Sequence, residues 1–405
     1  MRGEDMEQQK QIVIIGAGYA GMMAALRLAN QTRRQPVAIT LINAQDKFVE
    51  RIRLHQLATN QALVERPIAD MLRGTGVRFV QGTVTALDPT RKQITLQDST
   101  RPISYDKLVY ALGSYTERSR VPGAAGYAFT LDHASAMRLR ERLPGVAARG
   151  GKVLVSGAGL TGIESATEIA EVYPALRVEV VTSDSLEDDL SIPGAAYVHE
   201  TFRQLGITLR ERTTINRLEA NRALTGDGSA LPFDICVWAT GFGVSPLARQ
   251  SGLRVNPAGQ IVIDARLRSV SHPDIYAVGD AASFAPESGL SLRMACATAL
   301  PMAVQAADNL SAWLRGKPEQ PFGFGYMIRC ISLGRRRGLI QFVDADDRPQ
   351  PRIITGTAGA LIKEMICRYA FEALSMQRRG IGILWWSRAR SAGSAPELTA
   401  ARLRG

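Results

Sequence analysis

The chain has 405 residues, of which 45% are hydrophobic, and it carries a formal net charge of +11. Because this length exceeds what one ordinary core can serve, we expect two or three domains, and the 37 glycines are typical of an α/β enzyme with many tight turns. A run of about eighteen apolar residues is missing, which argues against a membrane-spanning helix. The polar N-terminus "MRGEDMEQQKQ" lacks the apolar segment of a secretion signal, so a cytoplasmic protein is expected.

The basic excess is concentrated near the end of the chain. Residues 321–405 carry 14 Lys and Arg against 6 Asp and Glu. Such a region either contacts anionic lipid, nucleic acid or an acidic partner, or forms an ordinary solvated face. The cysteines form no close pair and predict neither a disulfide framework nor a zinc site; they are Cys236, Cys296, Cys330 and Cys367.

The first predicted elements form a β-α-β unit. The strand "IVIIG" at residues 12–16 is followed by the helix "AGMMAALRLANQ" and the strand "VAITLI" at 37–42. Continuous hydrophobicity indicates strands buried on both faces of a parallel sheet. Residues 77–112 then alternate in the manner of short antiparallel strands and end in the apolar run Leu108–Leu112.

A second β-α-β unit follows in "KVLVSGAGLTGIESATEIAEVY" and "RVEVVTSD". The apolar pair "ICVWATGF" and "IYAVGDAA" closes the regular part. Joints containing Pro and Gly at 121–127 and 142–151 predict that the second unit is an insertion, and another joint at 315–325 begins a terminal region. The final "RSAGSAPELTAARLRG" is typical of a frayed tail.

The segment "GAGYAG" from Gly16 to Gly21 has the G-x-G-x-x-G spacing of a dinucleotide site between a strand and a helix. Gly16 permits the tight turn, Gly18 lets the backbone approach a pyrophosphate, and Gly21 lets helix and strand pack closely. The helix start then offers N–H donors to the phosphate. After the next strand, where an acidic residue usually binds the adenosine ribose, stands Asn43, whose amide hydrogen-bonds hydroxyls without a charge.

The same spacing recurs in "GAGLTG" from Gly157 to Gly162. Thr182 stands where NADH-selective sites carry a carboxylate, and Asp184 follows two residues later. Because no arginine directly follows the strand to hold a 2′-phosphate, NADH is favoured over NADPH.

A third signal is "YAVGDAA", with Gly279 and Asp280 after an apolar strand. Together, "IVIIGAGYAG", "LVYALGS", "VWATGF" and "IYAVGDAA" resemble the FAD- and NAD(P)H-binding pyridine nucleotide oxidoreductases. Their order is most similar to that of the type II NADH dehydrogenases. The likeness extends through "GAGLTGIESATE" to the basic, amphipathic C-terminus, over most of the chain.

The resemblance implies an α/β fold with two Rossmann-like, three-layer dinucleotide-binding domains and a small C-terminal α/β region. The FAD domain is discontinuous, over residues 10–120 and 259–320, and an NAD(P)H domain over 121–258 is inserted into it. A C-terminal region over 321–390 carries an amphipathic basic helix. Residues 391–405 form the tail.

In this family the glycines of the first motif face the FAD pyrophosphate, and the aspartate of the GD motif contacts the ribityl-pyrophosphate region. The alternative for Asp280 is a helix N-cap only. The cofactors implied are FAD and NADH or NADPH, without a metal. The residues assigned to cofactor binding are Gly16, Ala17, Gly18, Tyr19, Ala20, Gly21, Asn43, Val84, Ala111, Gly113, Gly279, Asp280, Gly157, Gly159, Leu160, Thr161, Gly162, Thr182 and Gly241.

Glu164 is the candidate catalytic residue. It follows the second motif in "TGIE" and matches a family glutamate near the nicotinamide and the flavin. There it would orient the nicotinamide amide or relay a proton. The alternative is a first-turn carboxylate favoured by the helix dipole.

The electron acceptor is where the chain departs from its relatives. It has neither the CxxxxC nor the CxxC pair of the disulfide-reducing members, and no cysteine precedes Cys236, which disfavours the two-cysteine mechanism of sulfide:quinone oxidoreductases. Quinone-reducing members carry "AQ" and a later Gln on the helix where this chain has Cys296, Ala297 and Pro301. The quinone signature is therefore missing. Cys296 and Cys330 are interpreted as packing residues, with a redox role left open.

The segment "FVERIRLHQLA" follows the first β-α-β unit, where the family lines the flavin entrance. Arg51, Arg53 and His55 are candidates for gating an acceptor channel or binding an anionic substrate. For His55, a structural hydrogen bond is favoured over catalysis.

Apolar residues recur at three- and four-residue steps in "ALIKEMICRYAFEALSMQRRGIGILWWSRAR", which ends with Trp385 and Trp386 between basic residues. One interpretation is a helix lying in a membrane interface. The other is that Leu361–Leu374 packs on the FAD domain and only the Trp pair is exposed.

The sequence therefore predicts an FAD-dependent oxidoreductase that takes hydride from NADH or NADPH and passes electrons to an unidentified acceptor, with a quinone as one candidate. It would be cytoplasmic or peripheral on the cytoplasmic face of the membrane, and a homodimer is compatible with the sequence. One alternative is an enzyme acting on a small organic substrate or a ferredoxin-like carrier. Another is a redox sensor with a basic nucleic-acid-binding tail, although no nucleic acid partner is expected.

Overall fold

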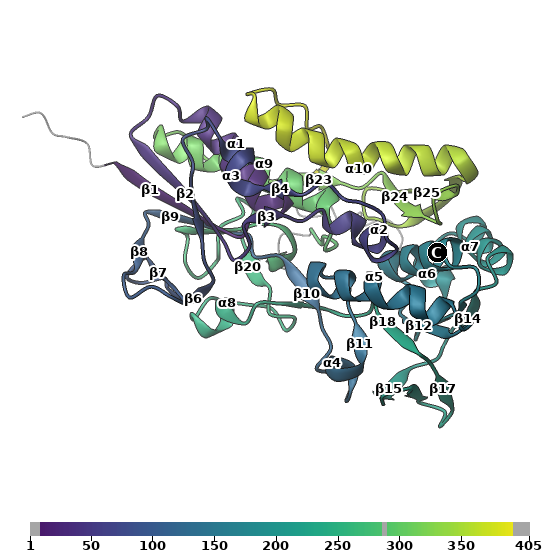
Figure 1. The fold of residues 1–405 in the computed structure, drawn as a ribbon. Helices are drawn as coiled ribbons and strands as arrows, with labels where there is room; N and C mark the ends of the chain where they lie inside the picture. The colour runs from purple at the N-terminus through teal and green to yellow at the C-terminus, as the bar shows by residue number, and fades with distance from the viewer. Residues whose placement is uncertain (1–8, 286–289, 392–405) are drawn as a thin grey trace, which may run out of the picture.

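The computed structural model describes residues 9–285 and 290–391, and Figure 1 shows a sheet on the left and another on the right with helices around them. The first sheet has the order β21-β9-β1-β2-β5 and only parallel pairings. Burial on both faces explains its continuous apolar runs. Its strands are β1 (Lys10–Ile15), β2 (Val37–Asn43), β5 (Arg78–Gln81), β9 (Lys107–Tyr110) and β21 (Ile275–Ala277).

Two helices of the first sheet, α1 (Tyr19–Gln31) and α9 (Cys296–Leu314), pack along each other. Arg27 on α1 makes a two-pronged contact with Asp308 on α9, with N–O distances of 2.6 and 2.9 Å. The chain thus returns to its first sheet after it has built the second one.

The second sheet has the order β11-β18-β12-β13-β14, again with parallel pairings. Its strands are β11 (Ala128–Phe129), β12 (Lys152–Ser156), β13 (Arg177–Val181), β14 (Thr208–Arg210) and β18 (Ile235–Trp238). The associated helices are α5 (His133–Ala147), α6 (Leu160–Val172) and α7 (Ile192–Gln204). An apolar core of its own, including Val155, Ile163 and Phe202, holds this unit together.

The alternating segment at 77–112 is not wholly antiparallel. Its first strand, β5, pairs in parallel with β2 at the edge of the first sheet. Only β6 (Val84–Asp88), β7 (Gln93–Leu96) and β8 (Ile103–Ser104) form an antiparallel sheet. Alternation was misleading here because an edge strand is exposed on one side, whatever its direction. The apolar pair predicted to close the regular part belongs to two sheets, as β18 and β21.

The terminal region consists of an antiparallel sheet, β24 (Ile328–Ser332), β25 (Gly338–Val343) and β26 (Pro349–Ile354), with helix α10 (Gly356–Arg378) across it. Two glycines permit the close contact: a Cβ on Gly359 would lie 2.4 Å from the Gly338 carbonyl oxygen. The helix α10 also packs on α1, and so joins the terminal region to the first sheet. No helix in the two described ranges is both long and apolar enough to cross a membrane.

Short elements complete the described chain. The strands are β3 (Lys47–Phe48), β4 (Arg66–Pro67), β10 (Ser114–Thr116), β15 (Ile215–Leu218), β16 (Arg222–Thr225), β17 (Ala230–Pro232), β19 (Phe242–Val244), β20 (Ile261–Ile263), β22 (Ala282–Phe284), β23 (Gly323–Gly325) and β27 (Ser387–Ser391). The helical turns are η1 (Arg51–Arg53), α2 (Leu54–Ala58), α3 (Ile68–Leu72), α4 (Ala124–Tyr127), η2 (Leu186–Asp188), α8 (Leu247–Gln250) and η3 (Gly279–Ala281).

We propose the domain boundaries that the sequence predicts, 10–120 with 259–320, 121–258 and 321–390, as the division of this fold. The sheet memberships support it, because β21 rejoins β1, β2, β5 and β9 while β11 to β14 and β18 stay together. Of the predicted tail, residues 392–405 lie outside the described residues.

Candidate functional site

The first glycine turn joins β1 to α1 with very little space. Gly16 has a φ of +96°, and a Cβ there would lie 2.3 Å from the carbonyl oxygen of Ala111. A Cβ on Gly21 would lie 1.8 Å from the Gly16 carbonyl oxygen. Gly18, by contrast, has open space where its Cβ would point. Two glycines therefore serve close packing of strand and helix, and the third leaves room beside the backbone.

The second glycine turn, between β12 and α6, repeats this arrangement. Gly157 has a φ of +101°, and a Cβ there would lie 3.0 Å from the Thr240 side chain. A Cβ on Gly162 would meet the Gly157 carbonyl oxygen at 1.9 Å, and Gly159 again faces open space. Leu160 and Thr161 begin α6, so their N–H groups lie at the open end of that helix.

The GD motif meets the first glycine turn and the start of α9. A Cβ on Gly279 would lie 3.4 Å from the Ala299 side chain and 3.5 Å from that of Ala20. A cavity of about 230 Å³ lies beside Gly279 and Asp280. Tyr19 follows Gly18 in the first glycine turn, and its hydroxyl is buried without a hydrogen-bond partner within the described part of the chain. Open space over Gly18 and an orphaned hydroxyl fit a bound dinucleotide at the first sheet.

Asp280 is held at the edge of this site by polar neighbours. Ser114 donates a hydrogen bond from its hydroxyl to the Asp280 carboxylate at 2.6 Å, and an Arg51 nitrogen lies 3.9 Å from the same oxygen. Arg51 also donates to the Ser114 carbonyl oxygen at 2.8 Å. Gly113, with a φ of +66°, forms the turn that brings Ser114 there.

Asn43 does not point freely at a ribose site. Its side-chain oxygen accepts a hydrogen bond from the Ala17 N–H at 2.9 Å, and its amide nitrogen donates to the Gln45 carbonyl oxygen at 2.9 Å. One amide N–H and one oxygen lone pair remain for a ligand. Asn43 therefore shapes the first glycine turn as well as lying at the end of β2.

The remaining predicted positions lie at strand ends. Val84 begins β6 and is half-buried, and Ala111 lies under the first glycine turn. Gly241, with a φ of +74°, lies between β18 and β19, where its carbonyl oxygen accepts from the Glu117 N–H. Thr182 is buried after β13 and its hydroxyl accepts from the Asp184 N–H at 3.3 Å.

Glu164 is buried on α6 between three separate segments of the chain. Lys363 of α10 lies 2.8 Å from one carboxylate oxygen, which also accepts the Ser332 N–H at 3.0 Å. His55 of α2 places Nδ1 3.8 Å from the other oxygen. The structure thus brings a predicted carboxylate and a predicted histidine together and adds a buried ammonium. At 3.8 Å the His55 contact is not the structural hydrogen bond that the sequence favoured.

Burial and charge set the protonation states of this cluster. Burial raises the pKa of Glu164, but Lys363, His55 and the Ser332 N–H outweigh it and hold the pKa below its usual value. Burial lowers the pKa of Lys363, yet the Glu164 carboxylate dominates and raises it. Burial lowers the pKa of His55 to about 4, so His55 is neutral at neutral pH. The cluster is therefore a fixed ion pair beside a neutral imidazole.

Cys296 is the first residue of α9, whose first turns lie next to the GD motif. Burial raises its pKa to about 12, and the charges of Lys363 and Asp280 both act on it. Burial likewise raises the pKa of Cys367 to about 11. Both are thiols at neutral pH rather than reactive thiolates, which agrees with the packing role expected for Cys296. The carbonyl oxygen of Cys330 accepts a hydrogen bond from Lys363 at 3.2 Å.

Comparison with known proteins now bears on this arrangement. Residues 10–308 match the family described as pyridine nucleotide-disulphide oxidoreductase. The chain belongs to that family. It is 26% identical over 342 residues to an NADH dehydrogenase-like protein of Mycobacterium tuberculosis, covering 80% of this chain and 85% of that one. It is 25% identical over 390 residues to the type II NADH:quinone oxidoreductase of Staphylococcus aureus, covering 89% and 94%.

Among solved structures, the NDH2 of Plasmodium falciparum in complex with NADH superposes with a TM-score of 0.77. It is 14% identical and covers 93% of this chain and 99% of that one, so it speaks for the fold alone. The predicted two-domain α/β fold and the family resemblance are both confirmed. As a pyridine nucleotide oxidoreductase, the protein is an enzyme that uses FAD and a nicotinamide dinucleotide.

Sequence reasoning missed several residues of the site. Lys363, Ser332 and Ser114 carry no motif, and their partners are distant in the chain. Of these residues, only Lys363 is marked in the sequence. It is a lysine within the apolar run "ALIKEMICRYAF", on a helix side that packs on the protein, where a lysine is rarely buried without a partner.

A valine at Gly159 tests the second dinucleotide site. Gly159 has an ordinary φ of −67° and open space around its Cβ direction, so valine is expected to leave the fold intact and obstruct a nearby ligand. We expect at least a roughly tenfold weaker affinity for NADH, measured by fluorescence titration, with FAD content and Tm unchanged. Gly126→Val in α4, another open position, is the control. Unchanged NADH affinity in the Gly159 variant would contradict the assignment.

The lowered pKa of His55 predicts a specific acid sensitivity. In the unfolded chain a histidine takes up its proton near pH 6.5, but the folded protein resists protonation of His55 until about pH 4. Stability is therefore lost as the pH falls from 6.5 towards 4. Denaturant unfolding should show that the free energy of unfolding falls more for the wild type than for His55→Gln between pH 6.5 and 4.5. This pH window lies above the ordinary range of a glutamate, so Glu164 does not contribute to the difference. Replacing the exposed His133 with Gln should leave the dependence of the unfolding free energy on pH as in the wild type. If this dependence is equal in all three proteins, the prediction is refuted.

Proposed function

We propose that this protein oxidises NADH and passes two electrons to a quinone at the junction of α6, α9 and α10. The observation that carries the proposal is the buried ion pair of Glu164 and Lys363, whose ammonium also acts electrostatically on Cys296 at the start of α9. Two nucleotide turns supply the entry of electrons, and the ion pair supplies a charged site for their exit. The NADH:quinone activity in the name of the Staphylococcus aureus relative supports the same acceptor class.

The residues that would hold FAD are those of the first glycine turn with Asn43, Val84, Ala111, Gly113 and the GD motif. FAD supplies the hydride and electron transfer, and the protein's own task is orientation and electrostatics. The backbone N–H groups at the start of α1 face the open space over Gly18 and would bind its pyrophosphate. Asp280, fixed by Ser114, would accept hydrogen bonds from ligand hydroxyls.

The second site is proposed for NADH rather than NADPH. Asp184 lies two residues after Thr182, and Arg212, whose backbone N–H donates to the Asp184 carbonyl oxygen, is already paired with Asp188 at 3.1 Å. The carboxylate of Glu211 lies in the same region, where it accepts a hydrogen bond from the Leu186 N–H at 2.7 Å. A 2′-phosphate would meet more negative than positive charge here, whereas ribose hydroxyls would find acceptors.

Lys363 would stabilise negative charge on the acceptor as it is reduced. Its pKa is raised, so it acts as a permanent cation in a buried place where a charge has a strong effect. Glu164 would position Lys363, with the Ser332 N–H and the Cys330 carbonyl oxygen fixing both partners. The pair would therefore favour the reduced acceptor over the oxidised one.

The chain departs from the quinone signature on α9, and this affects the shape of the proposed acceptor site. Cys296 and Ala297 begin the helix, and Pro301 lies inside it without an N–H donor. The site lacks amide side chains at these positions, so it depends on Lys363 for polar contact. A small organic substrate or a ferredoxin-like carrier stays the alternative acceptor. The redox sensor with a basic nucleic-acid-binding tail stays a further alternative, and residues 392–405 of that tail lie outside the described residues.

Glu164→Gln is the mutation that tests this function. It keeps an acceptor for the Ser332 N–H but removes the charge opposite Lys363. Stopped-flow reduction of the holoenzyme by NADH should stay within about twofold, while steady-state kcat with a soluble quinone falls roughly tenfold to a hundredfold and its pH profile shifts. FAD content and Tm show whether the variant has folded.

Glu141→Gln, an exposed carboxylate of α5, is the matched control and should leave both half-reactions unchanged. Loss of NADH-driven bleaching in the Glu164 variant would instead place Glu164 at the nicotinamide. A wild-type protein that is bleached by NADH but returns no electrons to any quinone would overturn the acceptor proposed here.

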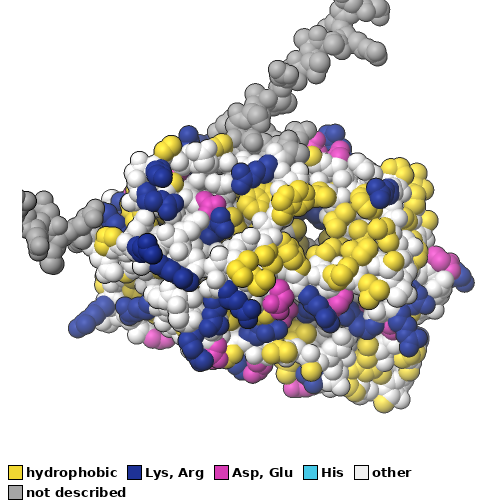
Figure 2. Space-filling view, turned by 90° about the horizontal axis from the view of Figure 1, so that it is seen from above, with side chains coloured by type: hydrophobic (Ala, Val, Ile, Leu, Met, Phe, Trp, Pro, Cys, Tyr) yellow, Lys and Arg dark blue, Asp and Glu magenta, His cyan; other side chains and the backbone are white. Residues whose placement is uncertain are grey.

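We also propose that one face of α10 contacts a membrane surface. Leu361, Met365 and Tyr369 recur at four-residue steps and are 61%, 60% and 39% exposed. Trp385 is 71% exposed and lies next to them, because its backbone N–H donates to the Tyr369 hydroxyl at 3.4 Å. We call these four side chains the α10 face. Seen from above α10, hydrophobic side chains gather in an area bordered by Lys and Arg (Figure 2).

One side of this helix packs on the protein, and the other side leaves exposed the apolar residues that the membrane interpretation requires. Its inner side packs on α1 and β25, as the buried Phe371 and Leu374 show, while its outer side remains apolar and exposed. The Trp pair is divided, because Trp386 is half-buried and donates to the Gly323 carbonyl oxygen at 2.9 Å. An exposed apolar stripe with basic neighbours is typical of an interfacial helix. Cytoplasmic, peripheral attachment and a homodimer both stay predictions.

Substitution of the α10 face tests the membrane contact. Burial of one large apolar side chain contributes about 1.5–3 kcal/mol, so Leu361→Gln and Trp385→Gln should each lower the partition coefficient on lipid vesicles roughly tenfold or more. Flotation of the holoenzyme with phosphatidylcholine vesicles measures this. Tyr127→Gln on α4, 47% exposed and far from α10 in Figure 1, is the control. Equal flotation of all variants would exclude the α10 face as the contact.

A further inference from the structure

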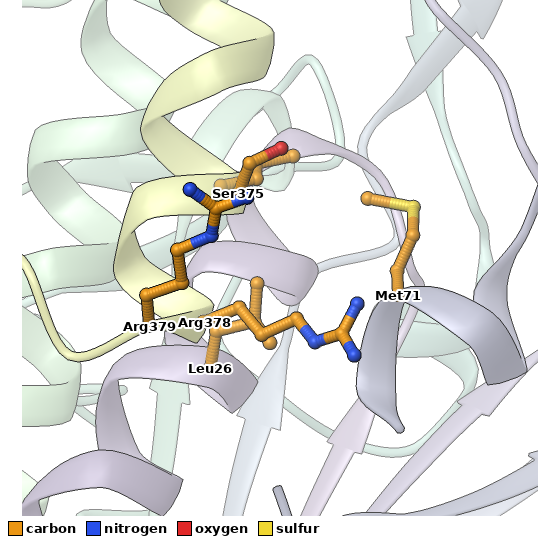
Figure 3. Close-up of a pocket in the computed structure, with 6 residues that line it drawn as sticks. Leu26, Met71, Ser375, Arg378 and Arg379 are labelled. Atoms are coloured by element: carbon orange, nitrogen blue, oxygen red, sulfur yellow. The ribbon is translucent and has the colours of Figure 1, made fainter. Parts of the chain in front are cut away.

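A cavity of about 330 Å³ lies at the C-terminal end of α10, where that helix passes α1 and α3. Its lining residues are Leu26, Met71, Leu374, Ser375, Arg378 and Arg379. Figure 3 shows Arg378 extending from α10 towards Met71 and Arg379 reaching up beside Ser375. This volume lies within the range of small-molecule sites, roughly 300–1,000 Å³.

The two arginines differ from most of their neighbours in having no counter-charge. Across residues 9–285 and 290–391, neither Arg378 nor Arg379 makes a side-chain hydrogen bond or ion pair. Arg368 on the same helix is paired with Glu364 at 2.8 Å, and Arg27 on α1 is paired with Asp308. Arginines in a last helical turn are favourable for the helix dipole, but that does not explain why both line one cavity with a serine.

The cavity lining defines the chemistry of its occupant. Two guanidinium groups and a hydroxyl are donors suited to a phosphate, which accepts paired hydrogen bonds from arginine. Leu26, Met71 and Leu374 offer apolar surface beside those donors. An amphiphilic phosphate diester meets both requirements, whereas an inorganic ion would use only the donors.

The cavity continues the α10 face. Five turns of about 3.6 residues separate Leu361 from Arg379, so both project from the same side of the helix. Around this side, Tyr369 is displaced by about 80° from Leu361, and Ser375 by about 40° in the opposite direction. A surface laid along the side of Leu361 would therefore pass Arg379, which lines the cavity.

We infer that the cavity formed by Ser375, Arg378 and Arg379 is a headgroup site for an anionic phospholipid. The inference rests on the proposed membrane contact and specifies it: the α10 face enters the apolar layer, and the two arginines bind one phosphate at its border. Neutral lipid would then support weaker attachment than anionic lipid, and the difference would depend on these two arginines.

The test compares flotation of the full-length holoenzyme on vesicles of phosphatidylcholine alone and of phosphatidylcholine mixed with phosphatidylglycerol. Each basic residue at an anionic surface contributes about fivefold in partition, so with two arginines the wild type should prefer the mixed vesicles roughly tenfold or more. Arg378→Gln with Arg379→Gln should abolish that preference and keep binding to neutral vesicles. Ser375→Phe, which fills the cavity without changing charge, should do the same.

The matched control is Arg368→Gln with Arg388→Gln, which removes equal charge from residues of the same region outside the cavity. This variant should keep most of the preference for anionic vesicles. If both double variants lose it equally, diffuse charge attraction is sufficient and the headgroup site is refuted. Tm and FAD content confirm that every variant is folded.

A soluble probe separates the headgroup site from the membrane contact. Monomeric dihexanoylphosphatidylglycerol should raise the Tm of the wild type and not that of the Arg378/Arg379 variant, and inorganic phosphate should raise neither. If no vesicle binds but the short lipid does, the proposed α10 contact fails while the headgroup site stands. If inorganic phosphate has the same effect as the short lipid, the occupant is a free phosphate and the lipid assignment is overturned.

Discussion

The buried ion pair between Lys363 and Glu164 is the contact around which the functional parts of the molecule are arranged. It joins α6, which begins at the second nucleotide turn, to α10, which packs on α1 of the first sheet. Taking two charges out of water is expensive, and their attraction often fails to repay it. The pair therefore contributes little net stability, and it holds one cation at a fixed place between α6 and α10.

The thiols that this ion pair acts on are protonated, and this bears on the proposed exit of electrons. Cys296 and Cys367 are protonated at neutral pH, since burial outweighs the favourable field of Lys363 at each of them. The thiolate is the nucleophilic form of cysteine, so neither is ready to attack a disulfide. The described cysteines are all free. The acceptor site that we propose thus does not use a cysteine pair.

The two nucleotide turns could be predicted from the sequence because their constraints are local. Each turn has three glycines within six residues: the first has a positive φ, the second has open space beside it, and the third lies where the helix packs closely. Gly16 to Gly21 and Gly157 to Gly162 both show this order. The contacts of Lys363 and Ser332 with Glu164 could not be predicted, because they depend on how α10 and the terminal sheet pack near α6. The direction of β5 was missed for a related reason: exposure sets its alternation, and the neighbouring strand sets its direction.

Helix α10 connects the acceptor site to the protein surface through its own periodicity. Leu361 and Lys363 are two residues apart, which places them about 200° apart around the helix, on opposite sides. Lys363 faces the Glu164 carboxylate, and Leu361 faces out with Met365 and Tyr369. A surface that covers the α10 face is then separated from Lys363 by little more than one helix diameter, about 10 Å. An apolar acceptor dissolved in a membrane would need only a short path along α10 to reach the cation that stabilises its reduced form.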